Sequence, residues 1–301
     1  MSNIEVKKLH SFSGHNDSIY SLEKMDDSRF FSSGGDGLVV LWNLESPDEG
    51  EVIVKTPESI YAMAFDQGSN HLLIGQNNSG IHKVSVAEKK EVKSIEIGKY
   101  QIFALKLHED RIWAGLSSGE VVILSSDLEV LHREKYASDR ARSIDFADGE
   151  AAVAFSDNTI KIIDTKTFEV LRELKGHKNS VFTAKYHPSG KYLLSGSRDA
   201  QLKVWDTSVS YVLRESIEAH LYSINDVTFR ADGKYFVSGS MDKSIKLWDA
   251  LNFKLKKVLD KHRHAGHGNS VNKLIWMNYR DLLVTCSDDR TISIWEIIIE
   301  E

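Results

Sequence analysis

Histidine, a serine or threonine, aspartate and tryptophan recur together at four places in this 301-residue sequence. The aspartate follows the histidine by 21 or 22 residues, and the tryptophan follows the aspartate by six. Serine, histidine and aspartate are the residue types of a catalytic triad, so nucleophilic catalysis is the first chemistry to consider. The four sets are His15, Ser32, Asp36 and Trp42; His177, Ser195, Asp199 and Trp205; His220, Ser238, Asp242 and Trp248; and His267, Thr285, Asp289 and Trp295.

The repetition of these sets argues against catalysis. One active site needs one triad, whereas this group returns at a fixed spacing in four separate segments. A repeated structural unit explains the pattern better, because a polar set inside each unit can satisfy its own buried donors and acceptors. We therefore predict no catalytic residue and no enzymatic activity.

Two other patterns suggest ligands. His262, His264 and His267 have a spacing that suits a metal site, but His267 already belongs to a recurring set. The basic stretch at 254–267 is then either a solvated loop or a contact for an acidic partner. The glycine-rich run at 33–37 lies between two expected strands rather than before a helix, so it indicates a tight turn instead of a phosphate loop. We predict no metal and no cofactor.

The elements that position the sets form a repeat. A motif of a polar residue, then usually isoleucine or valine, then often an aromatic residue occurs seven times. Neighbouring copies are 39 to 47 residues apart, so seven units fill residues 1–301 as one predicted domain. The motifs begin at Ser18, Ser59, Gln101, Arg140, Ser180, Ser223 and Ser270.

Each unit reads as four short strands. Segments of alternating apolar and polar residues, rich in β-branched and aromatic types, are separated by Gly, Asp and Pro. A four-stranded unit of about 40 residues repeated around a ring is typical of a β-propeller. We predict an all-β, seven-bladed propeller with four antiparallel strands per blade. The last unit lacks one strand, and the N-terminal segment Ile4–Phe12 resembles the missing one, so we expect it to complete the last blade and remove an open sheet edge.

Composition narrows the possible surroundings. The net charge of −6 argues against a generic binder of nucleic acid or of an anionic membrane. The single cysteine, Cys286, rules out an internal disulfide and fits a reducing compartment. No apolar run approaches the roughly 18 residues that would span a bilayer, and the N-terminal residues do not resemble a secretory signal. We expect a cytoplasmic protein with no nucleic-acid or membrane partner.

The spacing of the four sets resembles the WD-repeat (Trp-Asp repeat) β-propeller family, and the resemblance covers the whole chain. In that family the set forms a hydrogen-bond network inside each blade, from aspartate to histidine, histidine to hydroxyl, and hydroxyl to the indole N–H. Units two to four depart from the pattern because they lack the histidine. Their tryptophan positions are Val84, Leu124 and Ile163, and their aspartate positions are Asn78, Ser118 and Asp157.

The resemblance also implies a binding face. In WD-repeat propellers one face, the top face, carries the loops with the network aspartates and surrounds the mouth of a central channel. Four of the seven residues expected at the mouth are aromatic and could hold a cation or a planar side chain, although they could equally fill the inner core. The mouth residues are Tyr20, Tyr61, Phe103, Arg142, Phe182, Asn225 and Asn272, with Arg198, Met241 and Asp288 beside them. Nearby acidic residues favour a peptide carrying Arg or Lys; these are Asp17, Glu58 and Asp139.

We therefore expect a non-catalytic scaffold that binds an unidentified peptide or protein on the top face around the channel. An alternative is recognition of a small molecule or a modified residue in the channel mouth. A propeller enzyme is the less favoured alternative, because its site would need histidines and carboxylates at the mouth, and the seven mouth positions contain neither.

Overall fold

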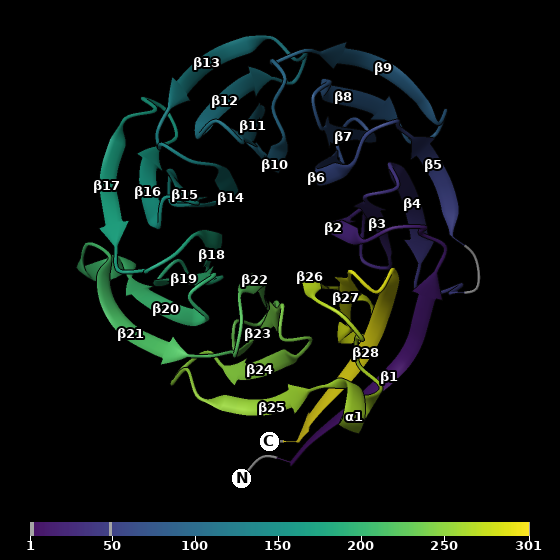
Figure 1. The fold of residues 1–301 in the computed structure, drawn as a ribbon, viewed down its shortest axis with the longest axis vertical. Helices are drawn as coiled ribbons and strands as arrows, with labels where there is room; N and C mark the ends of the chain where they lie inside the picture. Colours follow the sequence, from purple (N-terminus) through teal and green to yellow (C-terminus); the bar gives the residue numbers. More distant parts are fainter. Residues whose placement is uncertain (1–2, 48–49, 301) are drawn as a thin grey trace.

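A computed structural model describes residues 3–47 and 50–300. Seven four-stranded antiparallel sheets form a closed ring, with the first strand of each sheet nearest the centre and the last at the rim (Figure 1). The prediction of an all-β, seven-bladed propeller is confirmed. We number the blades along the chain from the sheet that begins at Ile19.

Blades one to four follow the chain without crossovers, and each runs from the innermost to the outermost strand. Blade one contains β2 (Ile19–Lys24), β3 (Arg29–Gly34), β4 (Leu38–Asn43) and β5 (Glu51–Lys55). Blade two contains β6 (Ile60–Asp66), β7 (His71–Gln76), β8 (Gly80–Ser85) and β9 (Lys90–Ile95). Blade three contains β10 (Ile102–His108), β11 (Arg111–Leu116), β12 (Glu120–Ser125) and β13 (Val130–Lys135). Blade four contains β14 (Ala141–Ala147), β15 (Glu150–Phe155), β16 (Thr159–Asp164) and β17 (Val170–Lys175).

Blades five to seven repeat this order, except that blade seven takes its outer strand from the other end of the chain. Blade five contains β18 (Val181–Tyr186), β19 (Tyr192–Ser197), β20 (Gln201–Asp206) and β21 (Val212–Glu218). Blade six contains β22 (Ile224–Phe229), β23 (Tyr235–Ser240), β24 (Ile245–Asp249) and β25 (Leu255–Leu259). Blade seven contains β26 (Val271–Trp276), β27 (Leu283–Ser287), β28 (Thr291–Glu300) and β1 (Asn3–Ser13). Short helices lie in three loops: η1 (Thr207–Val209), α1 (Lys261–His264) and η2 (Tyr279–Asp281).

Each blade buries both of its faces between neighbours. Successive residues of a strand point to opposite faces of the sheet, so Phe30 of β3 joins an apolar cluster with blade seven while Phe31 joins one with blade two. Seven such clusters fill the seven boundaries of the ring. Burying one phenylalanine or leucine side chain stabilises the fold by about 1.5–3 kcal/mol. Because every boundary between blades contains several large apolar side chains, the stabilising core is distributed around the ring.

The ring closes through the two ends of the chain. Strand β1 pairs antiparallel with β28, from Ile4 opposite Ile299 to Ser13 opposite Thr291, with a bulge between Lys8 and His10. Figure 1 shows these two strands side by side, purple against yellow. The expected N-terminal closure is confirmed, and β28 is paired on both sides, which leaves no open edge there.

A β-bulge lies near the start of every innermost strand. In blade one, the pairing of β2 with β3 shifts between Ile19 and Ser21, and the same shift occurs at the equivalent position of the other six blades. The bulged residue is the mouth residue of each blade, such as Tyr20. Because a bulge redirects a side chain out of the regular pleat, it gives these seven residues a shared orientation that strand alternation alone would not provide.

Candidate functional site

The recurring polar sets form continuous hydrogen-bond chains inside blades one, five, six and seven. In blade five, the Asp199 carboxylate lies 3.1 Å from His177 Nδ1, and His177 Nε2 lies 2.8 Å from Ser195 Oγ. Trp205 Nε1 donates to the same Oγ at 2.9 Å. Each hydrogen is used once if the indole donates to the hydroxyl, the hydroxyl to Nε2, and the Nδ1–H to the carboxylate. Blades one, six and seven contain the same bonds.

Burial fixes the charge states of these sets. It lowers the pKa of His177 and His220, more strongly than the neighbouring carboxylates raise it, which favours neutral imidazoles. Burial acts to raise the pKa of Asp199, but the hydrogen bonds from His177 and from the Lys178 amide outweigh it and hold this pKa well below its usual range. In blades five and six, each set is therefore a neutral histidine held by an ionised aspartate.

The geometry of the sets does not support nucleophilic catalysis. The hydroxyls of Ser32, Ser195, Ser238 and Thr285 belong to residues with 0% exposure, and each already accepts an indole N–H. A substrate could not reach these oxygens without unfolding the blade.

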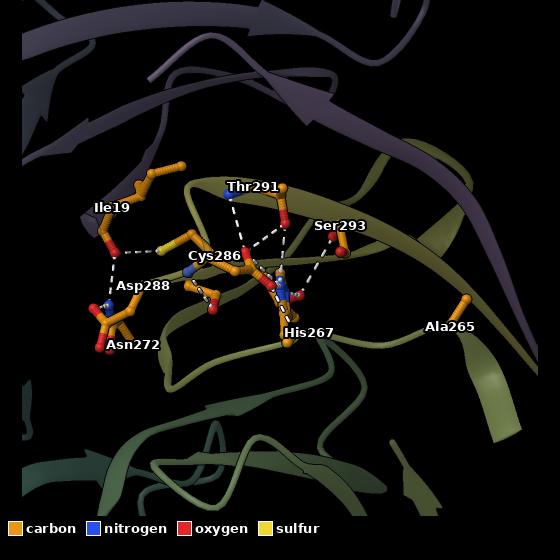
Figure 2. Close-up of polar contacts among 12 residues, drawn as sticks. Ile19, Ala265, His267, Asn272, Cys286, Asp288, Thr291 and Ser293 are labelled. Carbon is orange, nitrogen blue, oxygen red and sulfur yellow. Dashed lines mark hydrogen bonds and ion pairs between the residues drawn. The ribbon is translucent and has the colours of Figure 1, made fainter. Parts of the chain in front are cut away.

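Sequence reasoning missed a further member of two sets. Ser244 Oγ donates to Asp242 and Thr291 Oγ1 donates to Asp289, both at 2.6 Å. Figure 2 shows the contact between Thr291 and His267 in blade seven. The signal that could have found them is a hydroxyl residue two positions after the aspartate.

Blades two to four have apolar side chains at the same positions. Val84 lies opposite Leu72, Leu124 opposite Ile112, and Ile163 opposite Ala151, just as Trp42 lies opposite Phe30 in blade one. The hydroxyl position is likewise taken by buried residues, namely Ile74, Ala114 and Val153. No hydrogen-bond donor is buried at these positions, so no network is needed.

The mouth residues line one cavity at the centre of the ring. Its volume is about 700 Å³, within the range of small-molecule and peptide pockets. Its wall includes all ten residues that the sequence marked for partner binding: Tyr20, Tyr61, Phe103, Arg142, Phe182, Asn225, Asn272, Arg198, Met241 and Asp288.

One side of the mouth is a continuous stack across blades one to five. The ring centroids of Tyr20 and Tyr61 are 4.7 Å apart, and those of Tyr61 and Phe103 are 5.3 Å apart. The Arg142 guanidinium lies 4.4 Å from the Phe103 ring and 5.0 Å from the Phe182 ring. The slot between these two phenylalanines is thus filled by a cation of the chain itself, which the sequence did not reveal.

Arg142 remains a cation in this position. Burial, and then the neighbouring Arg140, lower its pKa to about 10, which still leaves the group protonated at neutral pH. Its Nε donates to Ser156 Oγ at 2.8 Å, which fixes the plane of the guanidinium.

The other side of the mouth is polar and cross-links the blades. Asn225 Nδ2 donates to the carbonyl of Val271 at 2.8 Å and thereby ties blade six to blade seven. Asn272 Nδ2 donates to the carbonyl of Ile19 at 2.9 Å and to Asp288 at 2.8 Å, which ties blade seven to blade one (Figure 2). Both amide groups are already engaged in these structural contacts.

A charged layer lies below the mouth, and sequence reasoning missed it. Lys106, Lys185 and Lys273 line the cavity together with Glu23. Lys185 Nζ lies 3.2 Å from Asp145, and Lys273 Nζ lies 3.1 Å from the buried Asp226. The available signal was a charged residue within an otherwise apolar inner strand. This signal did not indicate which acidic residue pairs with which lysine, because the paired residues lie 40 or more positions apart in the chain.

The basic stretch at 254–267 comprises the rim strand β25 and the loop that contains α1, so it is not a single solvated loop. Asp260 caps this helix through the Arg263 amide, and Lys8 Nζ donates to the carbonyl of Ala265. His267 is buried in the network of blade seven. Within the described residues, no group of three or more His, Cys, Asp or Glu side chains is placed to hold a metal ion. None of the helices in the described segments is long and apolar enough to cross a bilayer.

Both the sequence and the structure of this chain are similar to those of known proteins. The family model "WD domain, G-beta repeat" matches residues 6–43, 168–206, 211–249 and 257–296, the segments that carry the four polar sets. The WD40 β-propeller domain of Doa1 has a similar structure, with a TM-score of 0.84, 17% identity and 97% coverage of both chains.

Curated relatives share part of their length with this chain. The 66 kDa stress protein of Physarum polycephalum is 26% identical over 206 residues, covering 64% of this chain and 33% of its own. A probable cytosolic iron-sulfur protein assembly protein 1 of Kluyveromyces lactis is 28% identical over 172 residues, covering 56% and 40%. Mouse striatin-3 is 23% identical over 253 residues, covering 71% and 30%. The chain thus spans about a third of the length of these relatives. Its four family-model matches cover more than half of its residues, so it belongs to the WD-repeat β-propeller family, whose members generally serve as scaffolds for protein interactions.

Proposed function

We propose that this chain is a non-catalytic scaffold that binds a peptide segment of a protein partner on its top face, around the channel mouth. The supporting observation is the shared cavity wall, because ten residues from all seven blades meet there although they are far apart in sequence. A preformed surface loses little conformational entropy on binding, which favours recognition by a rigid ring. The burial of every network hydroxyl supports the absence of catalysis.

The proposed setting is the cytoplasm. The only cysteine, Cys286, is buried and unpaired, and one relative is named as a cytosolic assembly protein. Recognition of a small molecule remains the second candidate function, favoured by the cavity volume of about 700 Å³. Under that alternative, the cavity would bind its ligand without any associated protein.

The test is a double variant, Tyr61→Ala with Phe182→Ala, compared with wild type by affinity purification from the native cell. Both residues line the cavity, and neither belongs to a polar set. We expect the variant to lose its partner protein while it stays folded, with an unfolding temperature that falls only by the loss of the ring contacts of Tyr61 and Phe182. A matched control is Val130→Ala with Val170→Ala, which alters exposed side chains of the rim strands β13 and β17. Unchanged capture by the mouth variant, or equal loss in the control, would contradict the proposal.

A further inference from the structure

Three arginines gather at the mouth between blades four and five. Arg142 and Arg198 line the same cavity, and Arg140 and Arg198 both lie close enough to Arg142 to disfavour its charge. In residues 3–47 and 50–300, none of the three forms an ion pair; the one side-chain hydrogen bond among them joins Arg142 to Ser156. This is a local concentration of positive charge in a chain whose net charge is −6.

The deeper cavity wall adds to this excess. Five cationic side chains line the cavity, against two carboxylates: Lys106, Arg142, Lys185, Arg198 and Lys273, against Glu23 and Asp288. Lys185 is paired with Asp145 and Lys273 with the buried Asp226, and Asp288 is held by Asn272. Lys106 forms no ion pair in the described part of the chain, and Glu23 and Lys185 are the charged groups that act on it most strongly. The acidic residues Asp17, Glu58 and Asp139 do not line the cavity wall, although Asp139 lies close enough to Arg142 to favour its charge.

An exposed apolar patch adjoins these cations on the top face. Leu221, Tyr222 and Met241 are 83%, 62% and 55% exposed. The Met241 amide donates to the carbonyl of Ser223 at 2.9 Å, which places the two loops side by side. The loop of Leu221 is joined to the loop of Arg198 in turn, because the His220 amide donates to the carbonyl of Ala200. Exposed apolar side chains that lie together are typical of interaction sites.

We infer that the peptide segment recognised by this face is acidic: an oxyanion group, carboxylate or phosphate, enters the mouth beside Arg142, and an apolar residue next to it covers the Leu221–Met241 patch. The inference rests on the proposed function and names the chemistry of its partner. A guanidinium binds carboxylate and phosphate through paired, charge-assisted hydrogen bonds, and partly desolvated cations attract a counter-charge strongly. A peptide carrying Arg or Lys fits less well, since Arg142 already fills the aromatic slot.

The test uses four synthetic ten-residue peptides with the same leucine and tyrosine residues and a variable central pair. The pair is Glu-Glu, Gln-Gln, Lys-Lys or phosphoserine-Glu, and inorganic phosphate serves as a fifth probe. Binding to the ¹⁵N-labelled chain is followed by NMR through the arginine Nε–H signals. We expect the Glu-Glu or phosphoserine peptide to shift the Arg142 signal and to bind about tenfold more tightly than the Gln-Gln peptide. The ratio of these two acidic peptides distinguishes carboxylate from phosphate.

Arg198→Glu should reduce this binding about tenfold and weaken its dependence on salt, because it inverts one of the charges at the rim of the site. The matched control is Arg290→Glu, an exposed arginine of the blade-seven loop that does not line the cavity. Equal binding of the Gln-Gln peptide, preference for Lys-Lys, binding of inorganic phosphate alone, or equal effects of the two variants would each overturn the inference. If the acidic peptides fail while the Tyr61/Phe182 variant still loses its native partner, this inference falls and the proposed function stands. If both experiments fail, both fall.

Discussion

The ring divides into two arcs that are stabilised in different ways. Blades five, six, seven and one form one arc, and each contains a buried His–Ser/Thr–Asp–Trp set. Blades two, three and four form the other arc and have apolar side chains at the tryptophan and hydroxyl positions. The backbone is alike in both arcs, with four antiparallel strands and a bulge at the mouth residue. The same sheet can therefore be held by a polar network or by apolar packing.

The second arc relies on contacts between blades. At the boundary of blades three and four, the Trp113 ring lies 5.4 Å from Phe146 and 5.7 Å from Phe168, and His108 stacks on Phe146 at 4.2 Å. The Arg111 guanidinium lies over Phe168 and donates to the carbonyl of Thr165. Aromatic pairs of this kind contribute about 0.5–1.5 kcal/mol beyond their burial.

The two arcs also differ in how many of their buried polar side-chain atoms lack a hydrogen-bond partner. Among the described residues, four of the six buried side-chain polar atoms without a partner lie in blades two and three: His71 Nδ1, Asn77 Oδ1, His82 Nε2 and Trp113 Nε1. In the first arc every buried tryptophan of a set donates to a hydroxyl. The first arc also contains the seam, which is the pairing of β1 with β28 that joins the two chain ends. Blade seven, which contains this seam, and its two neighbours each contain a polar set.

Removal of residues 1–13 should have the largest effect, because it breaks the first arc at its seam. It deletes the buried Phe12 and Ile4 and exposes the isoleucine-rich edge of β28. We expect the unfolding temperature to fall by at least about 5 °C and the chain to aggregate, as measured by calorimetry and size-exclusion chromatography. Attaching the same residues after Glu301 through a short glycine-serine linker should restore both properties. An unchanged unfolding temperature of the truncated chain would contradict the role of the seam.

Substitution of tryptophan by phenylalanine in each arc gives the sharpest comparison. Trp205 and Trp113 are both buried, but Trp205 donates to Ser195 whereas Trp113 Nε1 has no partner among the described residues. Both variants lose ring volume, and only Trp205→Phe also breaks a hydrogen bond. We expect Trp205→Phe to cost about 1–2 kcal/mol more unfolding free energy than Trp113→Phe, as measured in urea. Equal costs would show that the network adds nothing to blade five.

Acid should weaken the first arc selectively, with a smaller effect. Because burial lowers the pKa of His177 and His220, the unfolded chain binds more protons than the folded chain below about pH 6.5, so stability falls as the pH decreases. Below about pH 4 the lowered pKa values of Asp199, Asp242 and Asp289 act in the same direction. Hydrogen exchange at pH 7 and pH 5 measures the effect. We expect amide protection to decrease more in blades five and six than in blades three and four, and a uniform decrease would count against the polar sets.

Much of the fold could be predicted because the repeat spacing maps directly onto geometry. Six residues from Asp199 to Trp205 span one turn and one strand, so the spacing places the recurring sets, and the resemblance to the WD-repeat family implies the network that joins them. The mouth residues followed from the resemblance to the WD-repeat family together with their place in the repeat, although the bulge that orients them has no sequence signal of its own. The placement of Arg142 between two rings of neighbouring blades, and the pairing of Lys185 with Asp145, depend on contacts across blades. Nothing in the spacing within a single unit encodes such contacts.

The most direct test of the account is Ser195→Ala, measured for both stability and partner capture. Ser195 is fully buried and accepts from Trp205 while contacting His177, so its loss leaves two polar groups without a partner. The account predicts a loss of about 1–3 kcal/mol of unfolding free energy, with partner capture retained at temperatures where the variant is folded. A variant that kept the stability of wild type but lost its biochemical function would contradict it, because that result is the signature of a catalytic serine.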